Sequence, residues 1–165
     1  MRNFSAYFFI FAAILIFIQC QNNNDGMLIE KNKEIAIRFY NDVLNNGALE
    51  LLDDIMSGDF IDHNAGPGQL RGIGAFKDFL KRITTAFPDL QIKIEDVLAD
   101  GNKVTARLSI TGTQTGPLGT IPASNIKANW TGIDILEIEN GKIISRWSER
   151  NLLGLMKQIG VIPDN

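Results

Sequence analysis

The sequence predicts an α+β domain: a curved, cone-shaped antiparallel sheet covered by three N-terminal helices, with a short helix at the C-terminus. Apolar residues recur at helical spacing up to Pro88 and alternate with polar residues after it. The pairs Asp-Gly at 100–101 and Asn-Gly at 140–141 are typical of tight turns between antiparallel strands. Helices first and a meander of strands afterwards favour this class over a parallel sheet.

The helices are predicted from apolar spacing and from the residues that stop them. Ile35, Phe39 and Val43 fall on one helical face, and Gly47 is well placed to end their helix. Pro88 ends the third helix because proline cannot continue the hydrogen-bonded ladder. The expected helices cover residues 29–46, 49–56 and 74–87, and a brief strand is expected at 60–64, between the second and the third.

The strands follow from a period of two. Leu90, Ile92 and Ile94 alternate with polar neighbours, and the same alternation returns in each later strand. A Gly/Pro-rich loop over residues 112–124 precedes the longest of them. The expected strands cover residues 90–94, 104–110, 126–138 and 142–149. A final amphipathic helix is expected at 152–159.

The N-terminal segment is expected to lie outside the fold. Residues 1–19 combine a basic start with an apolar run from Phe8 to Ile18, which is short for a membrane span and typical of a secretory signal. Cys20, the only cysteine of the chain, follows directly. The sequence therefore predicts a signal peptide at 1–19, a polar tether at 20–28 and one domain at 29–162.

The position of Cys20 resembles that in a bacterial lipoprotein signal, where the cysteine becomes the lipidated first residue of the mature protein. Phe17-Ile18-Gln19 departs from the usual pattern before that cysteine. We expect an exported lipoprotein anchored to a bacterial membrane, in the periplasm or on the cell surface. A soluble secreted or periplasmic protein and an uncleaved N-terminal anchor are the alternatives.

Composition excludes several classes of function. The chain has a net charge of −3 and no cluster of basic residues, so we expect no nucleic-acid binding. One histidine and one cysteine cannot form a Cys/His metal cluster, and no metal is expected. The sequence contains no glycine motif of the kind that cradles phosphate groups.

One carboxylate falls on the strand face that should be buried. Every second residue from Ile126 to Ile138 is apolar or small except Asp134. Burial disfavours the charged form, so we expect a raised pKa for the Asp134 carboxyl and a candidate general base or acid. The alternatives are a structural aspartate that accepts hydrogen bonds, and a bulge at Gly132 that turns Asp134 outward.

Several motifs resemble the SnoaL-like polyketide cyclases, also called ester cyclases. They are Ala86-Phe87-Pro88-Asp89-Leu90, Gly112-Thr113-Gln114-Thr115-Gly116, Gly132-Ile133-Asp134-Ile135, Gly141-Lys142-Ile143, Trp147 and the stretch Leu152–Gly160. Their order and spacing match over most of residues 30–160. The resemblance implies the nuclear transport factor 2-like fold, a cone whose open end holds a small-molecule pocket.

The resemblance also implies a reaction. Characterised members close a ring by an intramolecular aldol step on a polyketide methyl ester, without metal or cofactor, and their catalytic aspartate corresponds to Asp134. We therefore expect a small apolar or polyketide-like ligand and no cofactor. Gln114 stands where the family often has histidine, and Asn151 where an acidic residue is common. Gln114 can still bind an enolate, but neither amide can take a proton.

The remaining candidates are assigned from the family pattern or from their place in an element. His63 either shares protons with the base or ligand, or only fixes the glycine loop that follows it. Trp147 is expected in the pocket wall, whereas Trp130 and Tyr40 either line the pocket or pack in the core. Arg107 is either a donor to the enolate or an ordinary solvated arginine. Asn151 is kept as a pocket candidate.

Three functions remain open at this point. The leading hypothesis is an exported protein that binds a small, mostly apolar carbonyl compound and, with Asp134 as base, catalyses its cyclisation or a related isomerisation or hydrolysis. The second is a ligand-binding lipoprotein that has lost the chemistry, which Gln114 and Asn151 favour. The third is an interaction module that forms a homodimer through the outer face of the sheet.

Overall fold

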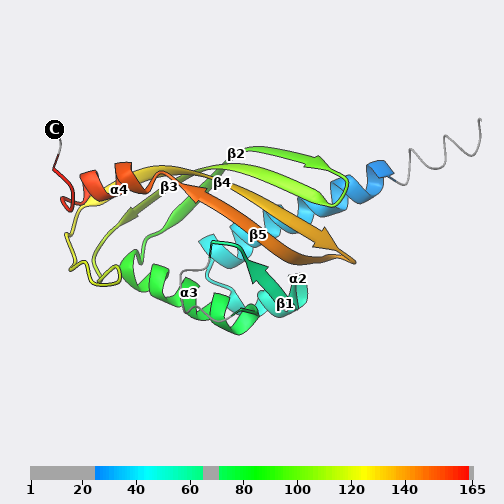
Figure 1. Cartoon of the computed structure of the whole chain (residues 1–165), viewed down its shortest axis with the longest axis horizontal. Coiled ribbons are helices and arrows are strands. Elements are labelled where there is room, and N and C mark those ends of the chain that lie inside the picture. Colours follow the sequence, from blue (N-terminus) through cyan, green and yellow to red (C-terminus); the bar gives the residue numbers. More distant parts are fainter. Residues whose placement is uncertain (1–24, 65–70, 164–165) are drawn as a thin grey trace, which may run out of the picture.

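The structure, a computed structural model, describes residues 25–64 and 71–163 (Figure 1). The expected signal peptide at 1–19, the lipidation site Cys20, the first part of the tether and the loop at 65–68 lie outside the described residues. Within the described ranges, no helix combines the length and apolar character needed to cross a membrane.

The predicted helices are present, with one of them divided. The first helix extends through residue 45, where its last turns widen into a π-helix, and Pro88 follows soon after the end of the third. A 3₁₀ turn and a single α-helical turn replace the second predicted helix. The helical segments are residues 25–38, η1 (Phe39–Asn45), η2 (Leu49–Leu51), α2 (Leu52–Ile55), α3 (Ile73–Ala86) and α4 (Leu152–Gln158).

Five strands form one sheet in the order β1-β5-β4-β3-β2. The last four run antiparallel as predicted, but β1 pairs parallel with β5, so the sheet is mixed. The sequence of β1 does not alternate clearly enough to predict its pairing. The strands are β1 (Met56–Asp62), β2 (Gln91–Asp100), β3 (Lys103–Thr113), β4 (Lys127–Glu139) and β5 (Lys142–Arg150).

The predicted hairpins lie where the chain must adopt a left-handed backbone. Gly101 has φ +56°, and Asn140 and Gly141 have φ +50° and +77°. Two consecutive residues with positive φ define the turn type whose twist suits an antiparallel hairpin, and Asn-Gly is its preferred sequence. This turn joins β4 to β5 and sets the starting register of the pair that carries the site.

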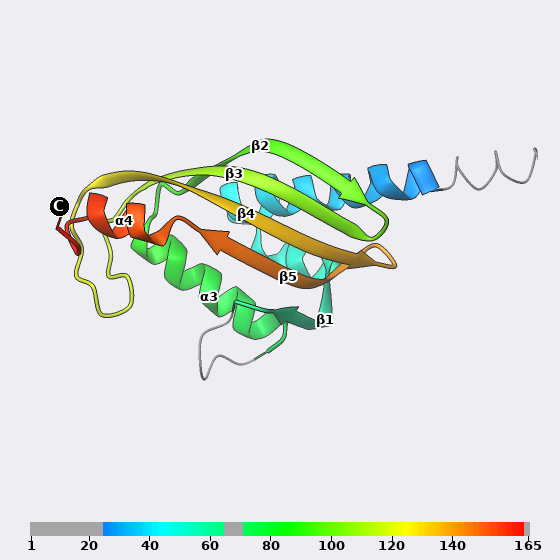
Figure 2. The same cartoon turned by 45° about the horizontal axis from the view of Figure 1, so that its top comes forward.

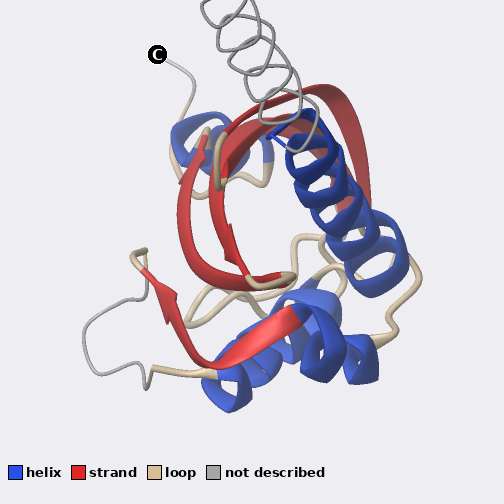
Figure 3. Ribbon diagram, turned by 90° about the vertical axis from the view of Figure 1, so that its right-hand side faces the viewer, coloured by secondary structure: helices blue, strands red, loops and turns tan. Residues whose placement is uncertain are grey.

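The sheet curls, and the helices close its concave side (Figures 2 and 3). Along β4, buried and exposed residues alternate through the whole strand, as the period of two predicted. Aromatic side chains of the first helix, β1 and α3 pack together beneath the sheet: Phe76 lies 5.0 Å from Phe60 and 6.1 Å from Phe39, between ring centroids. The fold class predicted from sequence is confirmed. In this fold, helices cover the inner face of β4 and β5.

Candidate functional site

Asp134 lies on the inner face of β4 and is completely buried. The pairing of β3 with β4 continues without a shift past Gly132, so Gly132 is not a bulge and the outward alternative is wrong. Asp134 is opposite Ala106 on β3 and Ser148 on β5. Strand parity alone therefore placed this carboxylate correctly.

Arg150 and Tyr40 contact the Asp134 carboxylate, and a hydrogen bond from the Ser148 side chain also favours its charged form. Arg150 donates from Nη1 to Oδ1 at 2.6 Å and from Nη2 to Oδ2 at 3.0 Å, a two-point charge-assisted contact. Tyr40 donates its hydroxyl hydrogen to Oδ2 at 3.1 Å. Tyr40 belongs to the π-helical segment η1, and such widened turns are frequent at functional sites.

Gly132 provides the room for Arg150. The two residues are opposite each other in the β4–β5 pair. A Cβ atom at position 132 would lie 2.6 Å from Arg150 Cδ and 2.9 Å from Cζ, which is too close for any real contact. The absence of a side chain at Gly132 therefore allows the Arg150 side chain to lie flat against β4 and reach Asp134.

The pKa of Asp134 is shifted in the direction opposite to the sequence prediction. Burial raises it, but the hydrogen bonds and positive charge of Arg150, with the charge of Arg146, outweigh burial and hold the pKa below its ordinary value. Burial, followed by the charge of Asp134, raises the pKa of Tyr40 well above its ordinary value. Asp134 is thus an anion, and Tyr40 is a protonated donor to it.

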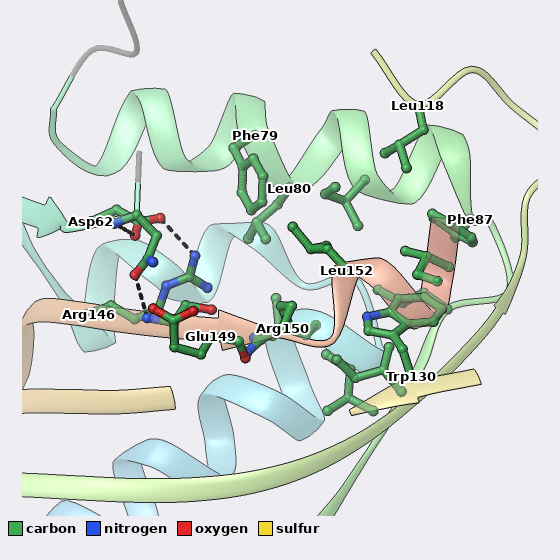
Figure 4. Close-up of a pocket in the computed structure, with 18 residues that line it drawn as sticks. Asp62, Phe79, Leu80, Phe87, Leu118, Trp130, Arg146, Glu149, Arg150 and Leu152 are labelled. Carbon is green, nitrogen blue, oxygen red and sulfur yellow. Dashed lines mark hydrogen bonds and ion pairs between the residues drawn. The ribbon is translucent and has the colours of Figure 1, made fainter. Parts of the chain in front are cut away.

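A cavity of about 380 Å³ lies between the sheet and α3 (Figure 4). Its size is within the range of pockets for small organic molecules. Most of its wall is apolar and comes from η1, α3, the sheet, α4 and the loops beside them. These apolar residues are Leu44, Phe79, Leu80, Ile83, Phe87, Leu90, Ile92, Ile110, Leu118, Trp130, Leu152 and Leu155.

The polar wall of the cavity follows the seam between β1 and β5. It consists of Asp62, Asn64, Arg146, Ser148, Glu149 and Arg150. Asp134 does not itself line the cavity; Arg150 lines it and binds Asp134. The Asp134 carboxylate is therefore separated from the cavity by the Arg150 guanidinium group that binds it.

Arg146 forms a second ion pair on this wall. Its Nη2 donates to Asp62 Oδ2 at 2.7 Å, and its guanidinium lies over the Phe76 ring at 4.7 Å and near the Phe79 ring at 6.0 Å. The side chains of Arg146 and Asp62 are only 6% and 10% exposed. The Nε of Arg146 is enclosed and has no hydrogen-bond partner among the described residues. The wall thus has an unused donor beside the cavity.

Of the sequence candidates, Tyr40 and Trp130 lie at the site. Tyr40 contacts Asp134 directly, and Trp130 lines the cavity while packing against Phe87 at 5.2 Å between ring centroids. Both residues are buried in the core. For Trp130 the two alternatives therefore hold together, whereas Tyr40 packs in the core and reaches the site through Asp134 without lining the cavity.

His63 and Trp147 lie on the opposite face of the sheet. Their rings stack in parallel, 4.2 Å apart, and Lys103 Nζ lies 5.3 Å from the Trp147 ring centroid. An unbroken hairpin from the Asn-Gly turn would pair Asp134 with Trp147. A register shift in the β4–β5 pair between Glu137 and Ile138 instead pairs Asp134 with Ser148.

This shift inverts the faces of the rest of β5. Trp147 pairs with Ile135, an exposed residue of the outer face, and Arg146 and Arg150 turn inward. The expectation that Trp147 belongs to the pocket wall is therefore wrong. His63, which stacks on Trp147, does not reach Asp134.

Gln114, Arg107 and Asn151 do not approach Asp134 either. Gln114 is buried near the end of β3, about 26 Å along the strand from the position opposite Asp134, and its amide donates to the Pro122 carbonyl at 3.1 Å. Arg107 pairs with Asp96 on the outer face at 2.6 Å. Asn151 caps α4 by accepting from the Gly154 amide at 3.0 Å. All three side chains have structural partners.

The sequence prediction missed Arg146 and Arg150. A signal was available, because the two arginines are four residues apart on one strand and so share a face. Which face they share depends on the register shift in the β4–β5 pair, which cannot be predicted from the sequence. As for metals, no three His, Cys, Asp or Glu side chains of the described ranges gather as possible ligands.

The chain belongs to the SnoaL-like polyketide cyclase family, whose model matches residues 34–159. It is similar to TsrD from Streptomyces laurentii, with 30% identity, a TM-score of 0.74, and coverage of 81% of this chain and 97% of TsrD. It is also similar to a candidate polyketide cyclase from Bacillus cereus, with 32% identity, a TM-score of 0.70, and coverage of 81% and 83%.

A candidate SnoaL-like polyketide cyclase from Jannaschia is 23% identical, with a TM-score of 0.74 and coverage of 82% of this chain and 96% of that one. At this identity the likeness concerns the fold. Comparison with curated proteins gave no match.

Proposed function

We propose that the protein binds a small, mostly apolar carbonyl compound in its cavity and catalyses cofactor-free acid–base chemistry on it, with Asp134 as base. An intramolecular aldol ring closure, or a related isomerisation or hydrolysis, is the reaction that the family favours. The observation that carries the proposal is a completely buried, ionised carboxylate joined by one arginine to a cavity of about 380 Å³.

The first chemical step is the removal of a proton from a carbon next to the ligand carbonyl. The C–H bond breaks, the proton passes to an Asp134 oxygen, and the electron pair moves onto the carbonyl oxygen to form an enolate. Negative charge thereby moves from Asp134 to the ligand, where Arg150 can pair with it. A positioned base contributes about 10²–10⁴-fold to such a step. The apolar wall contributes by folding the substrate so that the reacting carbons meet.

Access of the substrate to Asp134 is the demanding part of this mechanism. Arg150 covers the carboxylate on the cavity side, and its side chain is 19% exposed whereas that of Asp134 is fully buried. Proton transfer therefore needs Arg150 to move aside while a carbon of the ligand takes its place. The Arg150 guanidinium, released by Asp134, then pairs with the enolate oxygen. The arginine therefore has an anionic partner throughout the step.

The alternative is a ligand-binding protein of the same fold without catalysis. Two observations favour it: Asp134 has no surface on the cavity, and its pKa is held below its ordinary value, which makes it a weak base at rest. Under this alternative the Asp134–Arg150 pair serves only to shape the wall of the cavity.

Proton exchange separates these two functions without knowledge of the natural substrate. The probe is 2-acetylnaphthalene, a flat apolar ketone whose methyl protons lie next to its carbonyl. Proton NMR in heavy water follows the loss of the methyl signal, and fluorescence titration gives the affinity. An enzyme accelerates the exchange, and Asp134→Asn abolishes the acceleration while the probe still binds. Asp96→Asn, on the outer ion pair, serves as the matched control and leaves exchange unchanged.

The outcomes discriminate clearly. If the wild type binds the ketone but does not accelerate exchange, the non-catalytic alternative stands and the enzyme proposal is refuted. If the ketone does not bind, both proposals for this class of ligand fail. If Asp134→Asn does not fold, the double variant Asp134→Asn/Arg150→Met removes both charges together, and its exchange rate is measured at ketone concentrations high enough to saturate it.

We also propose that the protein is exported and anchored to a membrane through a lipid on Cys20. The support is the sequence of residues 1–20, which lies outside the described residues. The helical segment at residues 25–38 starts at the end of the molecule opposite α4 (Figures 1 and 2). Mass spectrometry of the mature N-terminus should find acyl chains on Cys20, and Cys20→Ser should release the protein from membranes. An unmodified N-terminus at another residue would contradict this proposal.

A homodimer through the outer face of the sheet is a further proposal. Ile133 and Ile135 of β4 are 48% and 37% exposed there, next to Trp147 across the β4–β5 pair. An exposed apolar stripe of this kind suits a second copy of the chain. Analytical ultracentrifugation should find a dimer that Ile133→Lys converts to a monomer, and a wild-type monomer at all concentrations would exclude it.

A further inference from the structure

The hydrogen bonds of Arg150 leave one edge of its guanidinium unused. Nη1 donates both of its hydrogens, one to Asp134 Oδ1 and one to the Glu149 carbonyl at 3.0 Å. Nη2 donates one hydrogen to Asp134 Oδ2. A guanidinium has five N–H groups, so Nε–H and the second hydrogen of Nη2 remain. Neither has a partner among the described residues.

These two N–H groups lie on the same edge of the planar group. Asp134 occupies the end-on edge between Nη1 and Nη2, and the side-on edge between Nε and Nη2 is left open. Unlike the Nε of Arg146, the Nε of Arg150 is not enclosed. Arg150 is 19% exposed at its side chain and lines the cavity, so the open edge is a two-donor fork accessible to a ligand.

The charges around the fork indicate which acceptor it suits. Each arginine of the cavity wall already has its own carboxylate: Asp134 for Arg150 and Asp62 for Arg146. Glu149 adds a further negative charge to the wall. A free carboxylate on a ligand would therefore meet little net positive charge. A neutral carbonyl oxygen needs only donors, and it can accept both N–H groups of the fork.

We propose that Arg150 is the residue that binds the carbonyl oxygen of the ligand, and that Asp134 and Gly132 are its positioning residues. Asp134 fixes the guanidinium by its two-point contact, and Gly132 leaves the space in which the side chain lies. This inference deepens the proposed function, since it uses the same cavity and names the group that recognises the ligand. It concerns binding and does not require that catalysis follows.

The arrangement gives the site its selectivity. The ligand must place a carbonyl within reach of the fork while the rest of its skeleton contacts the apolar wall at Phe79, Phe87 and Trp130. In Figure 4 Arg150 lies between the Asp62–Arg146 end of the cavity and the end formed by Phe87 and Trp130. The carbonyl therefore marks a point part way along the ligand, with apolar groups extending toward Trp130.

The carbonyl stretching band of 2-acetylnaphthalene tests this inference directly. Infrared difference spectroscopy with a ¹³C-labelled carbonyl reports hydrogen bonding at that oxygen alone. Bound to the wild type, the band should move to lower frequency than in an apolar solvent. Arg150→Lys keeps the positive charge but removes the fork, and it should return the band toward its apolar-solvent position. The control Arg107→Met alters the outer-face arginine and should leave the band unchanged.

Affinity provides a second measurement with a matched probe. 2-Ethylnaphthalene has nearly the shape of the ketone but no oxygen. Losing a hydrogen bond from a charged donor should weaken ketone binding by about tenfold to a hundredfold in Arg150→Lys while leaving the hydrocarbon unaffected. A merely structural role would weaken both probes equally. If Arg150→Lys does not fold, Asp134→Asn/Arg150→Met is compared with the wild type in the same way.

The results separate this inference from the proposed function. A shifted band that depends on Arg150, without proton exchange, supports the inference and refutes catalysis. Exchange that depends on Asp134, with a carbonyl band that does not respond to Arg150, refutes the inference and supports catalysis. Equal loss of ketone and hydrocarbon affinity in Arg150→Lys would also overturn the inference.

Discussion

Replacing Arg150 by methionine should destabilise the protein far more at neutral than at acidic pH. The substitution leaves Asp134 as a completely buried carboxylate with Tyr40 and Ser148 as neutral side-chain donors. Removing one partner of a buried ion pair costs about 3–5 kcal/mol of unfolding free energy. Removal of Arg107 from its exposed pair with Asp96 should cost less than about 1 kcal/mol, because water already solvates both charges.

The pH dependence follows from the direction of the Asp134 pKa. In the wild type the folded-state pKa lies below the ordinary value of 3.8. The group therefore contributes stability above its unfolded pKa, and this contribution is lost as pH falls through the folded pKa. In Arg150→Met, burial without the arginine raises the folded pKa. Asp134 then opposes folding above that raised pKa, and the opposition disappears when the carboxyl is protonated.

Urea unfolding at about pH 7 and about pH 4 measures this difference. The gap between the wild type and Arg150→Met should narrow at the lower pH, and Asp134→Asn/Arg150→Met should recover part of the loss at neutral pH. An equal loss at both pH values would mean that Arg150 stabilises the fold by packing and not by charge, contrary to this prediction. A neutral-pH loss below about 1 kcal/mol would refute the buried pair itself.

Two further substitutions test the geometry around the site. Gly132→Ala places a Cβ 2.6 Å from Arg150 Cδ and should cost about 1–3 kcal/mol in urea unfolding, whereas Gly58→Ala, where no atom lies within 4 Å, should be near neutral. Asn45→Ala removes two side-chain hydrogen bonds, of 2.8 and 2.7 Å, to the edge strand β2 and should cost about 1–3 kcal/mol. Asn46→Ala is the neighbouring control. If a substitution and its control lower the free energy of unfolding equally, in either pair, the contacts described would be contradicted.

The sequence predicted the position of Asp134 because strand parity is a local property. Its alternation with apolar residues continues unbroken along β4, and the Asn-Gly turn after it has the expected left-handed backbone. The prediction of its pKa failed for a different reason. Parity shows that a group is buried, but it does not show which charged side chain from another strand is buried beside it.

The residues of β5 illustrate the limit. The register shift between Glu137 and Ile138 moves Trp147 to the outer face and brings Arg146 and Arg150 inside. One extra residue in a strand exchanges its two faces, and no turn residue or composition signal marks the place. The pairing of β1 with β5 was equally out of reach, because it joins segments that are distant along the chain.

The most direct test of the account is the pKa of the Asp134 carboxyl in the free protein. Carbon-13 NMR of selectively labelled aspartate, titrated through the acid range with Asp134→Asn to assign the signal, measures it. We expect a value below 3.8 in the wild type and a raised value in Arg150→Met. A wild-type value above the ordinary range would show that the guanidinium is not paired with the carboxylate at the cavity wall.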